Sequence, residues 1–326
     1  MIFGLALLAM TGFVASATVG PISLALIEAV VNAIRGTGDT ASIVFVELRL
    51  PRAILGAAVG ASLGLAGAAL QGLLRNPLAE PGVVGVSGCA ALGAVLVFYS
   101  SLALTMPLSL PLGGIAGAFV GVGILYLLAG RGAGTLTLIL AGVAVNAFAG
   151  ALTALALNLS PNPFAALEIV FWQMGSLADR SLTHVGLSLP LMIVGWALLF
   201  STARGLDALS LGEETAASLG IALPRLRLCV VLGTAFAVGA AVAVSGVIGF
   251  VGLVVPHLLR GFVGHRPGRL LLASALGGAA LVLFADIAVR VVPTSVELKI
   301  GVLTALIGAP IFVLIVRNLQ RTRLVT

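Results

Sequence analysis

Long apolar runs, separated by short charged segments, make up almost the whole chain. Runs of about 17 to 25 apolar residues match the length that a helix needs to cross the hydrocarbon core of a bilayer. The pattern therefore predicts an all-α polytopic membrane protein with about ten transmembrane helices and with residues 1–326 in one transmembrane domain. The predicted spans are approximately 2–27, 53–74, 83–105, 107–130, 135–158, 184–203, 228–247, 248–264, 270–289 and 299–316.

Small residues recur at every fourth position in several predicted spans, and rows of this kind let helix backbones approach each other closely. We therefore expect one tight bundle, with close surfaces that either serve ordinary packing or also slide during a transport cycle. The rows are Gly56, Gly60, Gly64, Ala68 and Gly72; Gly113, Gly117 and Gly121; Gly233, Ala237, Ala241, Ser245 and Gly249; and Gly301, Ala305 and Ala309.

Composition agrees with a chain that is surrounded by lipid. Apolar residues make up 60% of the sequence and charged residues 9%, and the mean hydropathy is +1.23. A water-facing surface needs far more charge than this. The net charge of +6 does not indicate nucleic-acid binding, because the basic residues are scattered between apolar runs instead of clustering on one face.

The distribution of basic residues predicts the orientation of the chain. Eleven arginines fall on one set of predicted loops, and five arginines with the single lysine fall on the other set. Cytoplasmic loops carry the excess of basic residues. We therefore expect both termini in the cytoplasm, because an even number of spans places them on the same side.

The predicted spans are almost free of ionisable residues, which proton- and ion-coupled carriers use inside the membrane. Asp286 and Arg290 lie near the end of a span, four residues apart, and can pair on one helix face. No phosphate-binding loop surrounds the only lysine, Lys299. A membrane redox enzyme would need more axial haem ligands than three histidines offer. We predict no catalytic residues, no bound metal and a partner that supplies energy, with an ion-driven carrier as the alternative.

The connection between the sixth and seventh spans, residues 204–220, has the features of a short helix. Ser210 and Glu213 have the spacing of a capping box. Glu213 and Glu214 suit the positive N-terminal end of a helix, and Gly220 is suited to ending one. This segment is either an interfacial connector or a contact for a cytoplasmic partner.

On the opposite side, Arg49-Leu50-Pro51-Arg52 precedes the second span. We expect its two guanidinium groups at the surface, where they either anchor the helix by snorkelling or bind carboxylates of an external partner.

Several longer segments resemble the permease subunits of bacterial ATP-binding-cassette importers for iron-siderophores, haem and cobalamin, known as the FecCD type. The resemblance covers nearly the whole chain. Besides Arg49–Arg52, its segments are Gln71–Ser87, Leu211–Gly220, Ser245–Arg260, Ala285–Arg290 and Glu297–Pro310.

The resemblance implies the type II importer fold and a homodimer in the inner membrane. The translocation path would follow the dimer axis and open by alternating access. Two cytoplasmic ATPase subunits would hold ATP and Mg, a periplasmic binding protein would deliver the cargo, and the chain itself would bind no cofactor. Arg49, Arg52 and Arg290 resemble arginines that dock the binding protein. Gly134 and Thr135 match a cytoplasmic gate, although Leu136 and Thr137 depart from the cobalamin-type pattern.

The resemblance also assigns residues 205–222 to a coupling loop that contacts the ATPase. Its matching positions are Leu211, Gly212, Glu213, Glu214, Ala217, Leu219 and Gly220.

Residues 162–180 and 297–301 resemble the haem-importing branch most closely. The resemblance therefore implies haem as cargo, with siderophores and cobalamin as the alternatives. His257 fits a helix-end or packing residue better than a haem ligand.

Overall fold

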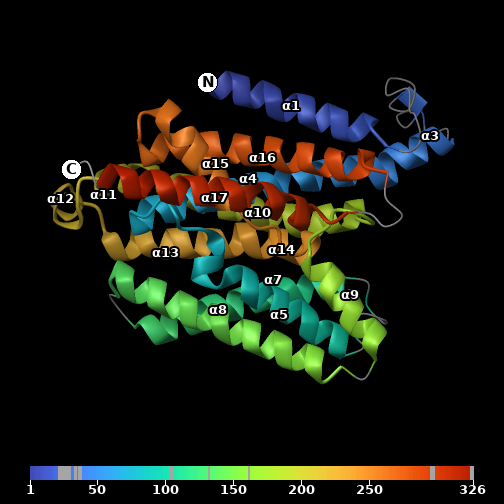
Figure 1. Cartoon of the computed structure of the whole chain (residues 1–326), viewed down its shortest axis with the longest axis horizontal. Helices are drawn as coiled ribbons and strands as arrows, with labels where there is room; N and C mark the ends of the chain where they lie inside the picture. Colours follow the sequence, from blue (N-terminus) through green and yellow to red (C-terminus); the bar gives the residue numbers. More distant parts are fainter. Residues whose placement is uncertain are drawn as a thin grey trace.

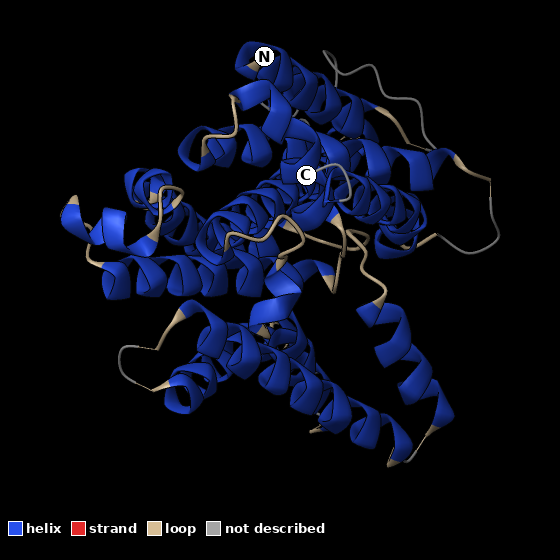
Figure 2. Cartoon of the chain, turned by 60° about the vertical axis from the view of Figure 1, so that its left-hand side comes forward, coloured by secondary structure: helices blue, strands red, loops and turns tan. Residues whose placement is uncertain are grey.

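The computed structural model describes residues 1–20, 31–32, 35, 39–100, 102, 106, 108–130, 133–160, 162–293 and 298–323. Within these residues the regular structure is entirely helical (Figure 2). The transmembrane helices are α1 (Ile2–Thr18), α4 (Leu50–Leu74), α5 (Val86–Tyr99), α7 (Ser109–Ala129), α8 (Thr135–Asn158), α10 (Leu182–Ser201), α13 (Leu223–Thr234) with α14 (Ala240–Ser245), α15 (Val251–Arg260), α16 (Pro267–Val291) and α17 (Ile300–Arg323).

Shorter helices connect or extend these spans. They are α3 (Thr40–Ile43), the π-helix η1 (Val44–Arg49), the 3-10 helix η2 (Pro81–Val84), α9 (Pro163–Gln173), α11 (Ala203–Leu209), α12 (Glu213–Ser218), the π-helix η3 (Ala235–Gly239) and the 3-10 helix η4 (Gly261–Val263). Because η3 joins α13 to α14 without a break, residues 223–245 form one continuous span.

Each predicted span coincides with a helix of suitable composition. Six helical stretches in the described part of the chain are long and apolar enough to cross a membrane, and four shorter apolar helices account for the other predicted spans. The all-α polytopic prediction is therefore confirmed.

Several predicted boundaries differ from the structure. The first helix ends at Thr18 instead of residue 27, and residues 21–30 lie outside the described part. The second begins three residues earlier than predicted, at Leu50, because η1 leads into it and Pro51 fits its first turn. The seventh and eighth spans are separated by residues 246–250, where Gly246 has φ of +70°.

Close backbone contacts between the helices confirm the packing prediction. A Cβ atom added to Gly60 would lie 2.2 Å from the carbonyl oxygen of Gly278, and one added to Gly64 would lie 2.1 Å from that of Ser274. Between α5 and α7, a Cβ atom on Gly117 would lie 2.2 Å from the Cys89 carbonyl oxygen. Only glycine permits these distances, so two pairs of helices pack backbone against backbone.

The transmembrane helices run roughly along the long axis of the molecule, and the short helices mark its two ends (Figure 1). The connection that contains α11 and α12 lies at one end, here named the α12 end. Helices α3 and α9 lie at the other, named the α3 end. The predicted functional residues therefore divide into two groups, one at each end of the bundle.

Candidate functional site

The predicted short helix in the 204–220 connection is present as α12, at residues 213–218, and Gly220 follows it with φ of +82°. The predicted capping box is wrong. Gly212 occupies the N-cap position without a side-chain cap, and the Ser210 hydroxyl instead donates a 2.6 Å hydrogen bond to the Asp207 carbonyl oxygen. The Glu213 carboxylate is directed to more distant partners instead of returning to the backbone.

Glu213 joins α12 to the starts of two transmembrane helices. Its Oε1 atom accepts a hydrogen bond of 2.9 Å from Arg227 Nη2 on α13 and one of 3.1 Å from Thr135 Oγ1 on α8. Arg227 Nη1 also donates a 3.0 Å hydrogen bond to the Ala133 carbonyl oxygen. We name these three residues, Glu213, Arg227 and Thr135, the α12 junction.

The electrostatics of the α12 junction favour an ionised Glu213. The hydrogen bond from Arg227 lowers the pKa of the Glu213 carboxyl group below its ordinary value, and the hydrogen bond from Thr135 and the positive charge of Arg75 act in the same direction. The Arg227 side chain is 10% exposed and the Glu213 side chain 46%. Arg227 is therefore an internal anchor for a loop that is open to solvent.

Most of the predicted coupling residues form an exposed surface around this anchor. Leu211 is 66% exposed and Leu219 is 61% exposed, and both are large apolar side chains at the tip of a loop. Ala216 is buried and holds the inner side of α12 against the bundle. Glu214, Ala217 and Gly220 are also exposed, and Gly212 is half-buried.

The predicted gate residues lie beside this loop. Gly134 is the N-cap of α8, and Thr135 is its first residue. The gate and the coupling loop lie far apart in the sequence, whereas the structure joins them through the Thr135–Glu213 hydrogen bond. Arg227 was not predicted as a site residue. Its position near the start of a span is typical of an ordinary interfacial arginine, and no local motif links it to Glu213.

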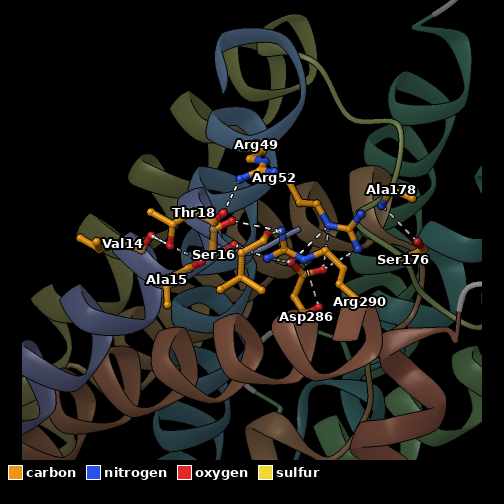
Figure 3. A network of polar contacts seen from close by, with 11 residues as sticks. Val14, Ala15, Ser16, Thr18, Arg49, Arg52, Ser176, Ala178, Asp286 and Arg290 are labelled. Carbon is orange, nitrogen blue, oxygen red and sulfur yellow. Dashed lines mark hydrogen bonds and ion pairs between the residues drawn. The ribbon is translucent and has the colours of Figure 1, made fainter. Parts of the chain in front are cut away.

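At the α3 end, three arginines and one aspartate form a polar network that ties α1 and η1 to α4 and α16 (Figure 3). Arg52 Nη2 lies 2.9 Å from Asp286 Oδ1, and Arg290 Nη2 lies 2.9 Å from Asp286 Oδ2. The Arg52 Nε atom donates a further hydrogen bond of 2.9 Å to Oδ1. The predicted pairing of Asp286 with Arg290 is thus confirmed, and Arg52 joins it from a position 234 residues away. We name Arg49, Arg52, Asp286 and Arg290 the arginine cluster.

The arginine cluster also binds the last carbonyl groups of α1. Arg290 Nη1 donates hydrogen bonds of 3.0 Å and 2.8 Å to the carbonyl oxygens of Ser16 and Val19, and Arg49 Nη1 donates one to that of Thr18. The final carbonyls of a helix lack intrahelical partners and carry partial negative charge. Guanidinium groups satisfy them here.

The expected surface position of Arg49 and Arg52 is wrong for this chain taken alone. Arg49 is 5% exposed, and the side chains of Arg52 and Arg290 are 15% and 8% exposed. The arginines can be buried because acceptors are available to them. Asp286, which is 0% exposed, offers a negative charge, and the end of α1 offers carbonyl oxygens. The docking role of the three arginines stays a prediction.

Comparison with known proteins places this architecture in a family. Residues 7–318 match the FecCD transport family. The vitamin B12 import system permease protein of Vibrio cholerae is 44% identical over 275 residues, which cover 83% of this chain and 82% of that protein. The hemin transport system permease protein of Yersinia pestis is 39% identical over 301 residues, which cover 88% of this chain and 87% of that protein.

A solved structure supports the same assignment. It is described as an inward-facing conformation of a metal-chelate type ABC transporter, and it superposes on this chain with a TM-score of 0.85 at 33% sequence identity. The match covers 97% of this chain and 98% of the other. The chain therefore belongs to the FecCD transport family, as a multi-pass inner-membrane permease subunit of an ABC importer for siderophore, haem or vitamin B12.

Proposed function

We propose that this chain imports haem as a homodimer. A periplasmic protein delivers haem at the α3 end, and two ATPase subunits that hold ATP and Mg act at the α12 end. Both termini then lie in the cytoplasm, the path follows the dimer axis, and neither a cofactor nor a metal belongs to the permease itself. The observation that carries the mechanism is the α12 junction, because it joins an exposed loop to the first residue of a transmembrane helix.

The coupling step follows from these contacts. An ATPase that binds Leu211, Glu214, Ala217 and Leu219 moves α12, and Glu213 is bound directly to α13 and α8. A movement of α12 therefore pulls on Thr135 and Gly134, the proposed gate. Such rigid displacement of helices is a known means of switching access between two sides.

Arg227 allows a sharp test of this step, because its buried side chain cannot itself contact the ATPase. The variant Arg227→Gln is expected to retain ATP hydrolysis in the assembled transporter while transporting less cargo per ATP. Arg225→Gln is the matched control, since Arg225 is an exposed arginine two residues earlier on the same helix. Equal coupling ratios in the two variants would contradict the role of the α12 junction.

Haem as cargo is supported by the α3 end. Helix α9 lies in the segment that resembles the haem branch, and it exposes Phe164 (78%), Leu167 (52%) and Phe171 (46%). The spacing of three and four residues places these side chains on one helix face. An apolar face at the proposed entrance suits a flat hydrophobic macrocycle.

The cargo is tested by ATP-dependent uptake into proteoliposomes that contain this chain, its ATPase and its binding protein. Haem, a ferric siderophore and cobalamin are supplied separately. Uptake of haem alone is expected. Uptake of another cargo would keep the importer and reject haem, and uptake without the ATPase would favour an ion-driven carrier.

Docking of the binding protein at the arginine cluster is the remaining part of the proposal. Arg52 is more exposed than Arg49 and Arg290, and a carboxylate of the binding protein could share it with Asp286. Arg52→Gln is expected to weaken binding-protein affinity, with Lys299→Gln as the control at the same end. Equal affinities for both variants would refute docking at this arginine.

A further inference from the structure

A polar cavity at the α12 end is not used by the coupling step. Its volume is about 200 Å³, which is enough space for several water molecules or a small anion. The last turns of α4, the end of α15, the start of α16 and Ser210 surround it. Two segments of the family resemblance, 71–87 and 245–260, therefore meet here in space.

The polar lining of this cavity is basic. Arg75, Arg260 and His265 contribute to it, together with Gln71 and the Ser210 hydroxyl group. In the described part of the chain, no ion pair connects any of the three basic side chains to a carboxylate. Basic side chains that are gathered in a concave site and form no ion pair there favour an anion.

Two carboxylates lie near the cavity, but neither forms an ion pair with its basic residues. The Oδ1 atom of Asp207 on α11 accepts a 2.7 Å hydrogen bond from the Gly268 amide. Glu213 forms its ion pair with Arg227, and the charge of Arg75 acts on it from a greater distance. The Arg260 guanidinium is held by a neutral group, the Gln71 side-chain oxygen, at 2.5 Å. Gln71 is 2% exposed, and its Nε2 atom is directed to the carbonyl oxygens of Gly252 and Leu253. The buried amide thus orients Arg260 without neutralising it.

The backbone on this side of the cavity already has an anionic partner. Helix α16 begins at Pro267, which lines the cavity, and the Asp207 carboxylate binds the Gly268 amide in its first turn. Arg75 and His265 both have positive φ, at 48° and 58°. Left-handed backbone costs a non-glycine residue roughly 1–2 kcal/mol, so both basic residues are held in the lining at an energetic cost.

We propose that this cavity binds a phosphate oxyanion, with Arg75 and Arg260 as its principal ligands. The phosphate comes from the headgroup of an acidic phospholipid in the leaflet at the α12 end, or from free inorganic phosphate. Both present tetrahedral oxygens that accept hydrogen bonds from guanidinium groups. Basic pockets between membrane helices are suited to anionic headgroups. The site lies beside Ser210, so an occupant is in contact with the connection between α11 and α12.

The test measures phosphatidylglycerol binding to the full-length permease in detergent by native mass spectrometry, with phosphatidylcholine as the zwitterionic comparison. Removing one guanidinium by Arg75→Gln is expected to weaken phosphatidylglycerol binding about fivefold, equivalent to ~1 kcal/mol per basic residue. Arg75→Lys keeps the charge but loses the forked donors of the guanidinium group, and its binding should lie between that of Arg75→Gln and that of the parent protein. Arg225→Gln, an exposed arginine outside the cavity, should leave binding unchanged.

Competition by inorganic phosphate distinguishes the two sources. Phosphatidylglycerol binding that resists phosphate, and that depends on Arg75, identifies a lipid headgroup site. Displacement by phosphate, again dependent on Arg75, identifies a site for the free anion. The proposal is overturned if neither anion binds, or if Arg75→Gln and Arg225→Gln weaken binding to the same extent.

Discussion

Replacing Asp286 by asparagine is expected to destabilise the protein more than any single change at an exposed charge. Asp286 is completely buried in α16, and its two carboxylate oxygens lie 2.9 Å from guanidinium groups of Arg52 and Arg290. The amide of asparagine is nearly the same size but carries no charge. The change therefore leaves two largely buried guanidinium groups without their shared counter-charge while preserving the packing volume.

The magnitude follows from the burial of all three groups. Removing one partner of a buried ion pair costs about 3–5 kcal/mol, because the remaining charge stays in a medium of low dielectric. In globular proteins the unfolding entropy averages about 2.1 cal/mol/K per residue, which for 326 residues gives ~0.7 kcal/mol/K. On this scale the variant Asp286→Asn should lower Tm by about 4–7 °C.

Thermal unfolding of the purified permease in nanodiscs measures this shift, with Asp179→Asn as the control. Asp179 is an exposed aspartate between α9 and α10, and its positive φ of 56° suits asparagine equally well. Adding Arg52→Gln to Asp286→Asn should recover part of the loss, because it removes one of the two stranded charges. A Tm within about 1 °C of the Asp179→Asn value would refute the ion-pair argument.

Three further changes test other contacts. Gly64→Ala should lower Tm, because its Cβ atom would lie 2.1 Å from a backbone carbonyl oxygen of α16, whereas Gly123→Ala, with no atom within 4 Å, should not. The pKa of the Glu213 carboxyl group is lower in the folded protein than its ordinary value of 4.5. Glu213 should therefore stabilise the docking of α12 fully above pH 4.5, and this stabilisation should be lost as the pH falls through the folded-state pKa. Hydrogen exchange of the α12 amides, corrected for the intrinsic exchange rate at each pH, measures this stabilisation. The variant Glu213→Gln should abolish its pH dependence. Thr135→Val should reduce cargo transported per ATP without changing ATPase assembly, and an unchanged ratio would argue against the Thr135–Glu213 contact.

Local chemistry explains the features that the sequence predicted correctly. The number and approximate position of the spans follow from the length of apolar runs, because lipid admits few other structures. The rows of small residues correctly predicted close packing, since a missing side chain is visible in the sequence. The Asp286–Arg290 pair was predictable because the two residues are four apart on one helix.

Tertiary contacts explain the features that it did not predict. The sequence contains no local indication that Arg52 reaches Asp286, 234 residues away. The capping box failed for a related reason. Ser210 and Glu213 have the correct spacing, but Arg227 offers Glu213 a charged donor that the Ser210 backbone amide cannot match. Residue spacing predicts contacts within a helix, whereas contacts between helices depend on how the bundle assembles.

Helix α4 connects the arginine cluster at the α3 end with the basic cavity at the α12 end. This helix has 25 residues and is therefore about 37 Å long. It carries Arg52 at the α3 end and Gln71 near the α12 end. Between them, Gly60 meets Gly278 of α16 with backbone against backbone, so no side chain is present there to change rotamer and absorb a displacement. A shift of the arginine cluster must therefore either move α4 and α16 together, cavity included, or separate them at the glycines.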